Sequence, residues 1–175
     1  GGYDGEPLRA TNRSEASHST VEVPGVPSIE LWATFRVGAR GRVHHVRTGR
    51  EAGWDWVTAV SSWPGDTHHL LRLVAHHPHG ALLVADRLMA GKAPRAGVGR
   101  LLLAPGVTEV GERTLRHGPV TVRVEASVPL ESATGWRFPD RAHPVQGPEL
   151  RYSVGVHASS STPTEKRSSG PWTGW

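Results

Sequence analysis

The sequence predicts an all-β protein, an antiparallel β-sandwich of about nine to ten short strands followed by a disordered C-terminal tail. Three observations lead to this prediction. Several segments alternate apolar and polar residues with a period of two, turn-forming residues recur between them, and long segments with the helical period are missing. Many short strands separated by turns are typical of sandwiches and barrels.

The clearest strand candidates have one apolar and one polar side. The apolar side of the segment 28–38 consists of Ile29, Leu31, Ala33, Phe35 and Val37. The apolar side of the segment 119–127 consists of Val120, Val122 and Val124. A third segment, 149–157, carries on one side Leu150, Tyr152, Val154 and Val156. Because successive side chains of a strand point to opposite faces, each segment predicts a strand with one buried face.

Other segments complete the predicted sandwich. Three are apolar on both sides, which predicts strands that are buried more fully: 69–76, 80–88 and 99–106. Shorter strand candidates are 20–23, 42–48 and 56–63. Pro, Gly, Asp and His clusters between them favour turns. The last residues are rich in Ser, Thr, Pro and Gly, so we expect one domain over 1–157 and a disordered tail over 158–175.

Composition excludes several classes of protein and site. The 175 residues suffice for one domain, and the absence of Cys excludes disulfides and thiolate metal sites. The longest apolar run falls short of the roughly 18 residues that span a membrane, so we expect no membrane partner. The net charge of +4 is spread without basic–aromatic clusters, so we expect no nucleic-acid partner. The first residue is Gly, which leads us to expect a piece of a longer protein.

Three groups among the 11 histidines are candidates for metal binding. His44 and His45 are neighbours in a strand candidate, as are His68 and His69, so each pair should point to opposite faces and not share a metal. His77 and His79 have the spacing of one strand face, but the proline between them favours a turn. We interpret these residues as surface histidines.

Two further features have both a structural and a functional interpretation. Asp86 lies at the end of a buried apolar run, where a carboxylate must be paired, and pairing with an arginine is favoured over catalysis. Trp54 and Trp56 are spaced to lie on one side of a strand. They predict either a sugar-stacking platform or aromatic core packing, and the sequence favours the second.

Taken in order, segments of the chain resemble one family of enzymes. The stretch GGYDGEPLRATNRSEASHSTVEV, followed by SIELWATFRVG, resembles the arginine-containing segment, the His-Asn-Thr-Val strand and the next strand of heparinase II/III-like polysaccharide lyases. The stretches HHLLRLVAHHPHGALLVADRL, LLLAPGV and GWRFPDRAHPVQGPELRYSV follow where related pieces of that family are expected. The resemblance spans about residues 1–156 and covers the C-terminal β-sandwich region.

The resemblance implies an enzyme that cleaves uronic-acid polysaccharides by β-elimination. In this family an N-terminal α/α toroid of helices precedes the sandwich. A base removes the proton next to the uronate carboxylate, and an acid protonates the leaving oxygen. Tyr and His residues mainly perform these steps, and they are expected upstream of Gly1. The resemblance therefore implies that the isolated chain holds no catalytic residue and is inactive.

The resemblance also implies a zinc ligand. In the family, zinc is held by a His of a His-x-His motif, by an Asp and by the His of the His-Asn-Thr motif. His18 matches the last of these, with Ser19 where Asn is usual. The other two ligands have no counterpart, since Asp4 follows Tyr3 and the family's Asp precedes the Tyr segment. A structural zinc site needs about four ligands, so we expect weak zinc binding or none.

Three functions stay open at this point. The first is the sandwich of a lyase whose parent protein is secreted or periplasmic, with an acidic polysaccharide and the missing toroid as partners. The second is a carbohydrate-binding module that uses Trp54, Trp56 and arginines, and the third is a structural domain without a ligand. A sandwich cut from its toroid exposes an apolar interface, so we also expect self-association.

Overall fold

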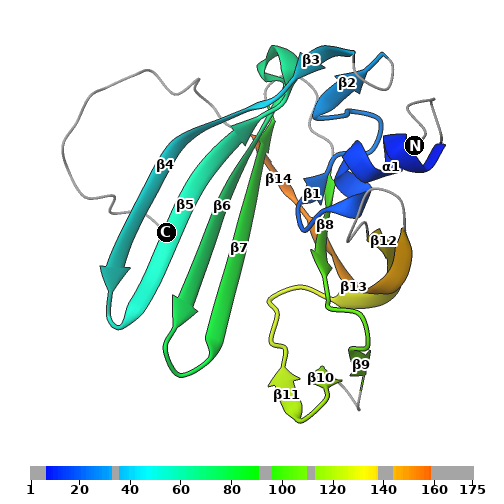
Figure 1. Ribbon diagram of the computed structural model, residues 1–175. Helices are drawn as coiled ribbons and strands as arrows, with labels where there is room; N and C mark the ends of the chain where they lie inside the picture. Colours follow the sequence, from blue (N-terminus) through cyan, green and yellow to red (C-terminus); the bar gives the residue numbers. More distant parts are fainter. Residues whose placement is uncertain (1–6, 33–35, 91–95, 110–112, 138–143, 159–175) are drawn as a thin grey trace.

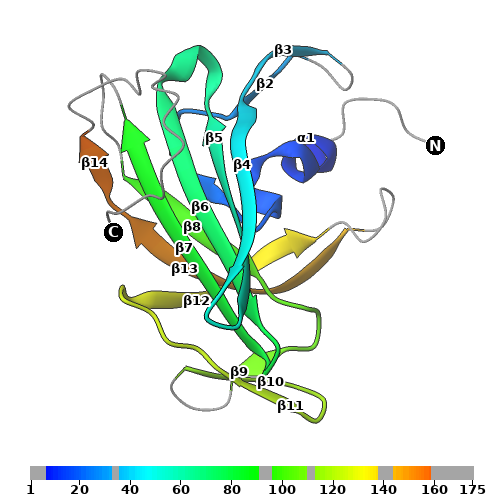
Figure 2. The same cartoon turned by 90° about the vertical axis from the view of Figure 1, so that its left-hand side faces the viewer.

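The computed structural model describes residues 7–32, 36–90, 96–109, 113–137 and 144–158. A five-stranded sheet and a four-stranded sheet pack together, and two small sheets lie beside them (Figures 1 and 2). Fourteen strands occur in the described residues, and four of them, β1, β2, β9 and β14, have three residues or fewer. The predicted all-β sandwich class is confirmed. The larger count has two causes. The strands at 108–109, 114–117 and 130–137 were not predicted, and the predicted segments 28–38 and 149–157 each contain parts of two strands.

The five-stranded sheet has the order β14-β7-β6-β5-β4. Its strands are β4 (Arg42–Glu51), β5 (Trp54–Ser62), β6 (His68–His77), β7 (Ala81–Ala90) and β14 (Val156–Ala158). Strands β4 to β7 form consecutive antiparallel hairpins, and β14 pairs in parallel with β7. Gly53 and Gly80 adopt positive φ values of 83° and 88° in the hairpin turns, a conformation that glycine adopts without strain. Strand β14 includes Ala158, and the rest of the predicted tail lies outside the described residues.

The four-stranded sheet has the order β1-β8-β13-β12. Its strands are β1 (Val21–Glu22), β8 (Gly97–Leu102), β12 (Leu130–Arg137) and β13 (Val145–Val154). Helix α1 (Pro7–Arg13) and the 3₁₀ turn η1 (Glu15–Ser17) precede β1. The turn η1 contacts both edge strands, β1 and β12, so this N-terminal segment crosses one face of the sheet (Figure 1). A second 3₁₀ turn, η2 (Pro64–Asp66), joins β5 to β6.

The prediction of one strand over 28–38 is wrong. The segment forms two short strands, β2 (Ile29–Leu31) and β3 (Val37–Arg40), which pair antiparallel with each other. The chain therefore reverses direction between them, and Ala33 and Phe35 lie outside the described residues. Alternation of apolar residues continued across the reversal, so the period alone did not reveal the turn.

The core lies between the two larger sheets and contains residues from both. Its buried members are Val21, Val23, Trp63, Leu70, Leu88 and Val154, with Val26 and Tyr152 packed against them. Leu70 of β6 is directly paired with Leu88 of β7. Since strand side chains alternate, the even-numbered residues of β6 and β7 face the core and the odd-numbered residues face away. The predicted apolar side of 149–157 is confirmed at Leu150 and Val154, which are both 6 % exposed.

Two burial predictions are wrong. Val120 and Val122 belong to a small sheet of β9 (Thr108–Glu109), β10 (Thr114–His117) and β11 (Val120–Arg123), where they are 56 % and 51 % exposed. In the segment 80–88, Leu82 is 66 % exposed, although Leu88 is fully buried. Strand β11 is an edge strand, and the first half of β7 extends past the four-stranded sheet (Figure 1). The apolar segments predicted these strands correctly, but they did not predict which side chains of the strands would be buried by other elements.

The helical content of the described residues is small. Helix α1 has seven residues, and the described part of the chain contains no helix that is long and apolar enough to cross a membrane.

Two leucines on the same side of β7 test the position of the core. Leu88→Ala should lower the free energy of unfolding by about 2–5 kcal/mol, because it opens a cavity between the sheets. Leu82→Ala should change it by no more than about 0.5 kcal/mol, because that side chain is exposed. Urea unfolding of both variants measures the difference. Equal losses would contradict this placement of the core.

Candidate functional site

His18 lies at the junction between η1 and β1. Its backbone N–H donates to the carbonyl of Glu15 at 3.1 Å, and its own carbonyl accepts from the N–H of Thr20 at 2.9 Å. The residue is exposed, and Nε2 lies 3.0 Å from the carbonyl oxygen of Asn12. The backbone is therefore fixed locally while the imidazole stays accessible.

Residue 19 is held from both sheets. The guanidinium of Arg72, on β6, donates through Nη1 to the carbonyl of Ser19. The backbone N–H of Leu102, at the end of β8, donates to the Ser19 hydroxyl oxygen at 2.9 Å. Two strands from different sheets thus fix the residue that follows His18.

Arg72 belongs to a buried network that joins the sheets. Its Nε and Nη2 donate to the two carboxylate oxygens of Asp86 at 2.7 and 2.8 Å. The Tyr152 hydroxyl, on β13, donates to Asp86 Oδ2 at 2.5 Å. The Asp86 side chain is 2 % exposed and that of Arg72 is 20 % exposed. The predicted pairing of Asp86 with an arginine is confirmed.

The environment of Tyr152 disfavours its ionised form. Burial raises the pKa of Tyr152 well above its usual value, and the hydrogen bond to Asp86 raises it further. Gly99, paired with Tyr152 across β8 and β13, leaves room for the ring, since a Cβ at that position would collide with it. The neutral phenol therefore remains a donor to Asp86.

A second charged cluster lies on the other face of the four-stranded sheet. Glu149 is 1 % exposed, and Arg151 Nε donates to its Oε1 at 2.5 Å. Arg100 pairs with Glu22 at 2.6 Å and lies 4.0 Å from Glu149. Burial lowers the pKa of Arg137, and Glu149 opposes this effect. The sequence did not indicate this cluster, because charges that alternate along a strand are typical of a solvated face.

The histidine predictions have mixed outcomes. His68 is 2 % exposed and its ring lies 6.2 Å from that of Trp63, so its interpretation as a surface histidine is wrong. His69 points to the opposite face, as predicted, where its ring lies 6.3 Å from that of His44. The prediction for His44 and His45 is wrong, since their rings are 4.6 Å apart. A bulge in β4 and a φ of 52° at His45 break the alternation there. Burial, followed by the nearby His45 and His69, lowers the pKa of His44.

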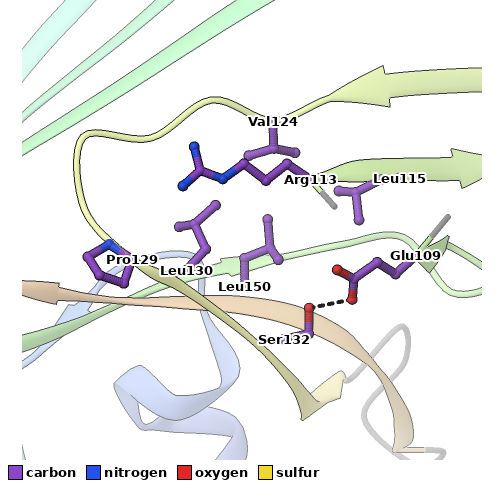
Figure 3. A pocket seen from close by; sticks show the side chains of 8 residues that line it. All are labelled: Glu109, Arg113, Leu115, Val124, Pro129, Leu130, Ser132 and Leu150. Atoms are coloured by element: carbon purple, nitrogen blue, oxygen red, sulfur yellow. Dashed lines mark hydrogen bonds between the residues drawn. The ribbon is translucent and has the colours of Figure 1, made fainter. Parts of the chain in front are cut away.

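A cavity of 220 Å³ lies between the small sheet and strands β12 and β13 (Figure 3). Its polar rim holds Arg113 and Glu109, and the Ser132 hydroxyl donates to Glu109 Oε2 at 2.8 Å. Apolar residues line the rest of it: Leu115, Val124, Pro129, Leu130 and Leu150. The sequence did not predict this cavity, because its lining comes from separate strands and loops that only the tertiary fold brings together.

A family model described as "Heparinase II/III-like, C-terminal" matches residues 1–169. The chain belongs to this family. The recognition from sequence is therefore confirmed.

One solved structure that resembles this heparinase II/III-like domain carries the description heparinase III gene product. The match has a TM-score of 0.60 and 13 % identity, and it covers 87 % of this chain and 24 % of the other chain. At this identity the match supports the fold alone. The domain thus corresponds to about a quarter of that longer protein. The search of curated proteins gave no match.

The zinc prediction can be compared with the donor atoms that this heparinase II/III-like domain provides. In the part of the chain that the structure describes, three or more His, Asp, Glu or Cys residues nowhere converge as a metal site. His18 contributes one nitrogen, and Asp4 lies outside the described residues. One imidazole does not make a zinc site of about four ligands. The role of His18 as a zinc ligand therefore stays a prediction.

Tyr152 gives a pH-dependent test of the buried network. Its pKa in the folded state lies above the unfolded value of about 10, so its contribution to stability is complete below pH 10 and is lost as the pH rises beyond it. The chain has two tyrosines, so a Tyr3→Phe variant isolates Tyr152 in an ultraviolet titration. Tyr152 should ionise only as the domain unfolds. Ionisation near pH 10 with the fold intact would contradict the buried bond to Asp86.

Proposed function

We propose that this domain is the C-terminal sandwich of a polysaccharide lyase that cleaves uronic-acid-containing polysaccharides by β-elimination. The observation that supports the proposal most is the family match over residues 1–169. The sandwich fold and its likeness to a heparinase III structure agree with it. In the reaction, the proton next to the uronate carboxylate goes to a base and the glycosidic C–O bond breaks. A C=C double bond forms, and the leaving oxygen takes a proton from an acid.

Within this proposal the domain has a supporting role. The base and the acid belong to the part of the parent protein upstream of Gly1. The domain contributes an accessible imidazole, His18, whose flanking backbone is fixed by Glu15, Arg72 and Leu102. A fixed backbone lowers the entropy that an imidazole loses when it binds a ligand. The parent protein acts on an acidic polysaccharide and is secreted or periplasmic, because such polymers occur outside the cytoplasm.

Turnover of acidic polysaccharides tests the proposal. The full-length protein that contains this domain should release unsaturated uronate products from heparan sulfate, alginate or a related polymer, which ultraviolet absorbance detects. The chain 1–175 alone should give no turnover under the same conditions. Turnover by the isolated chain, or none by the full-length protein on any uronate polymer, would refute the proposal.

Metal content tests the role of His18 separately from activity. We expect the purified full-length protein to bind zinc, and His18→Ala should remove most of it, because one of few ligands is lost. His79→Ala serves as a control, since His79 is an exposed histidine in the turn between β6 and β7. Elemental analysis of the purified variants gives the ratio of zinc to protein. Full zinc retention in His18→Ala would remove this residue from the ligand set.

A further inference from the structure

The five-stranded sheet has an outer face that points away from the core. Leu70 and Leu88 face the core, so the alternate residues Leu71 and Arg87, which are paired across β6 and β7, face outward. Trp56 is paired with the odd-numbered Ala75 of β6 and therefore lies on the same outer face. Trp54, two residues earlier on β5, shares that face. This outer face is continuous over the four antiparallel strands β4 to β7 (Figure 2).

Trp56 lies flat on this face. It is paired with Gly49 of β4, and a Cβ at position 49 would collide with the indole ring. The ring therefore covers the bare backbone of β4, and the residue remains only half-buried. An indole that lies flat over a glycine presents its other π-face outward.

Trp54 adds a second aromatic surface two residues away. Its ring and that of His77 are 5.1 Å apart with an interplanar angle of 63°. His77 is itself held, since its Nδ1 accepts from the backbone N–H of His79 at 3.3 Å. Packing of this kind holds the orientation of an indole and lowers the entropy cost of binding a ligand on it.

Cationic side chains lie on the same face. Arg47 is exposed two residues from Gly49 on β4, and Arg87 is exposed on β7. Asp86 and Asp55 point to the core side, where Asp55 pairs with Arg50 at 2.5 Å. Among the residues of β4 to β7, Glu51 at the end of β4 is the one acid on the outer side. The face thus combines flat aromatic rings with arginines that suit carboxylates and sulfates.

We infer that this outer face, defined by Trp54, Trp56, Arg47 and Arg87, binds a segment of an acidic polysaccharide. The two indoles stack on the apolar C–H faces of sugar rings, and the arginines pair with uronate carboxylates or sulfates. Strand spacing places β4 about 14 Å from β7, so bound sugars span the sheet between the two arginines. The choice of an acidic polymer rests on the proposed function, but binding itself requires no catalysis.

Binding by the isolated chain 1–175 tests this inference. Calorimetry with size-defined heparin and alginate oligosaccharides should give binding that weakens as salt rises, because the arginine contacts are screened. Neutral dextran should not bind. Trp56→Ala should weaken binding about tenfold, through the loss of a stacking surface. Arg47→Ser combined with Arg87→Ser should weaken it by a similar factor and flatten the salt dependence.

Matched controls lie elsewhere on the domain. Trp32 directly follows β2 and is 68 % exposed beside Gly38 of β3, so Trp32→Ala should leave binding unchanged. Arg116 and Arg123 are exposed on β10 and β11. Changing both to serine removes the same amount of charge and should leave oligosaccharide binding unchanged. If Trp56→Ala fails to fold, the arginine pair still tests the face, since both side chains are exposed.

The outcomes separate this inference from the lyase proposal. Unchanged binding in the Trp56 and arginine variants, equal losses in the controls, or equal binding of dextran would overturn the inference. A full-length enzyme with turnover but no binding by the isolated chain would overturn it and leave the lyase proposal intact. Binding by the isolated chain, with no turnover by the full-length protein, would refute the lyase proposal and leave this inference intact.

Discussion

The carboxylate of Asp86 joins the two sheets at one buried point. It accepts two hydrogen bonds from Arg72 on β6 and one from Tyr152 on β13. A carboxylate removed from water is costly unless its partners are in place. Arg72 and Asp86 are paired within one sheet, so a packing that separates or slides the two sheets loses the bond from Tyr152. Apolar burial drives the sheets together without direction, and this network favours one relative placement of β6, β7 and β13.

The same network connects the core to both functional surfaces. Arg72 reaches the carbonyl of Ser19, so the residue next to His18 is held by the contact that joins the sheets. Arg87 follows Asp86 directly, and alternation turns it to the outer face beside the paired Leu71. On β7, the buried carboxylate of Asp86 is therefore one residue away from the outer face that we assign to the polysaccharide.

The sequence predicted the fold class because alternation is set by residues within one strand. It also predicted the pairing of Asp86, because a carboxylate in an apolar run has few stable alternatives. It failed at the reversal within 28–38 and at the bulge near His45, where a local change of backbone leaves the apolar pattern intact. Two features depend on which strands lie next to each other, and a single sequence does not reveal this pairing. They are the charged cluster around Glu149 and the flat placement of Trp56 over Gly49.

Amide hydrogen exchange of an Asp86→Asn variant tests most directly whether the buried carboxylate controls the His18 junction. The Leu102 N–H, which donates to the Ser19 hydroxyl, reports on the junction. The Trp63 N–H, which donates to the carbonyl of His68, reports on the core away from it. Protection at Leu102 should fall about tenfold more than at Trp63, because Arg72 loses its charged partner and with it the hold on Ser19. Equal loss at both amides, or none at Leu102, would contradict the account.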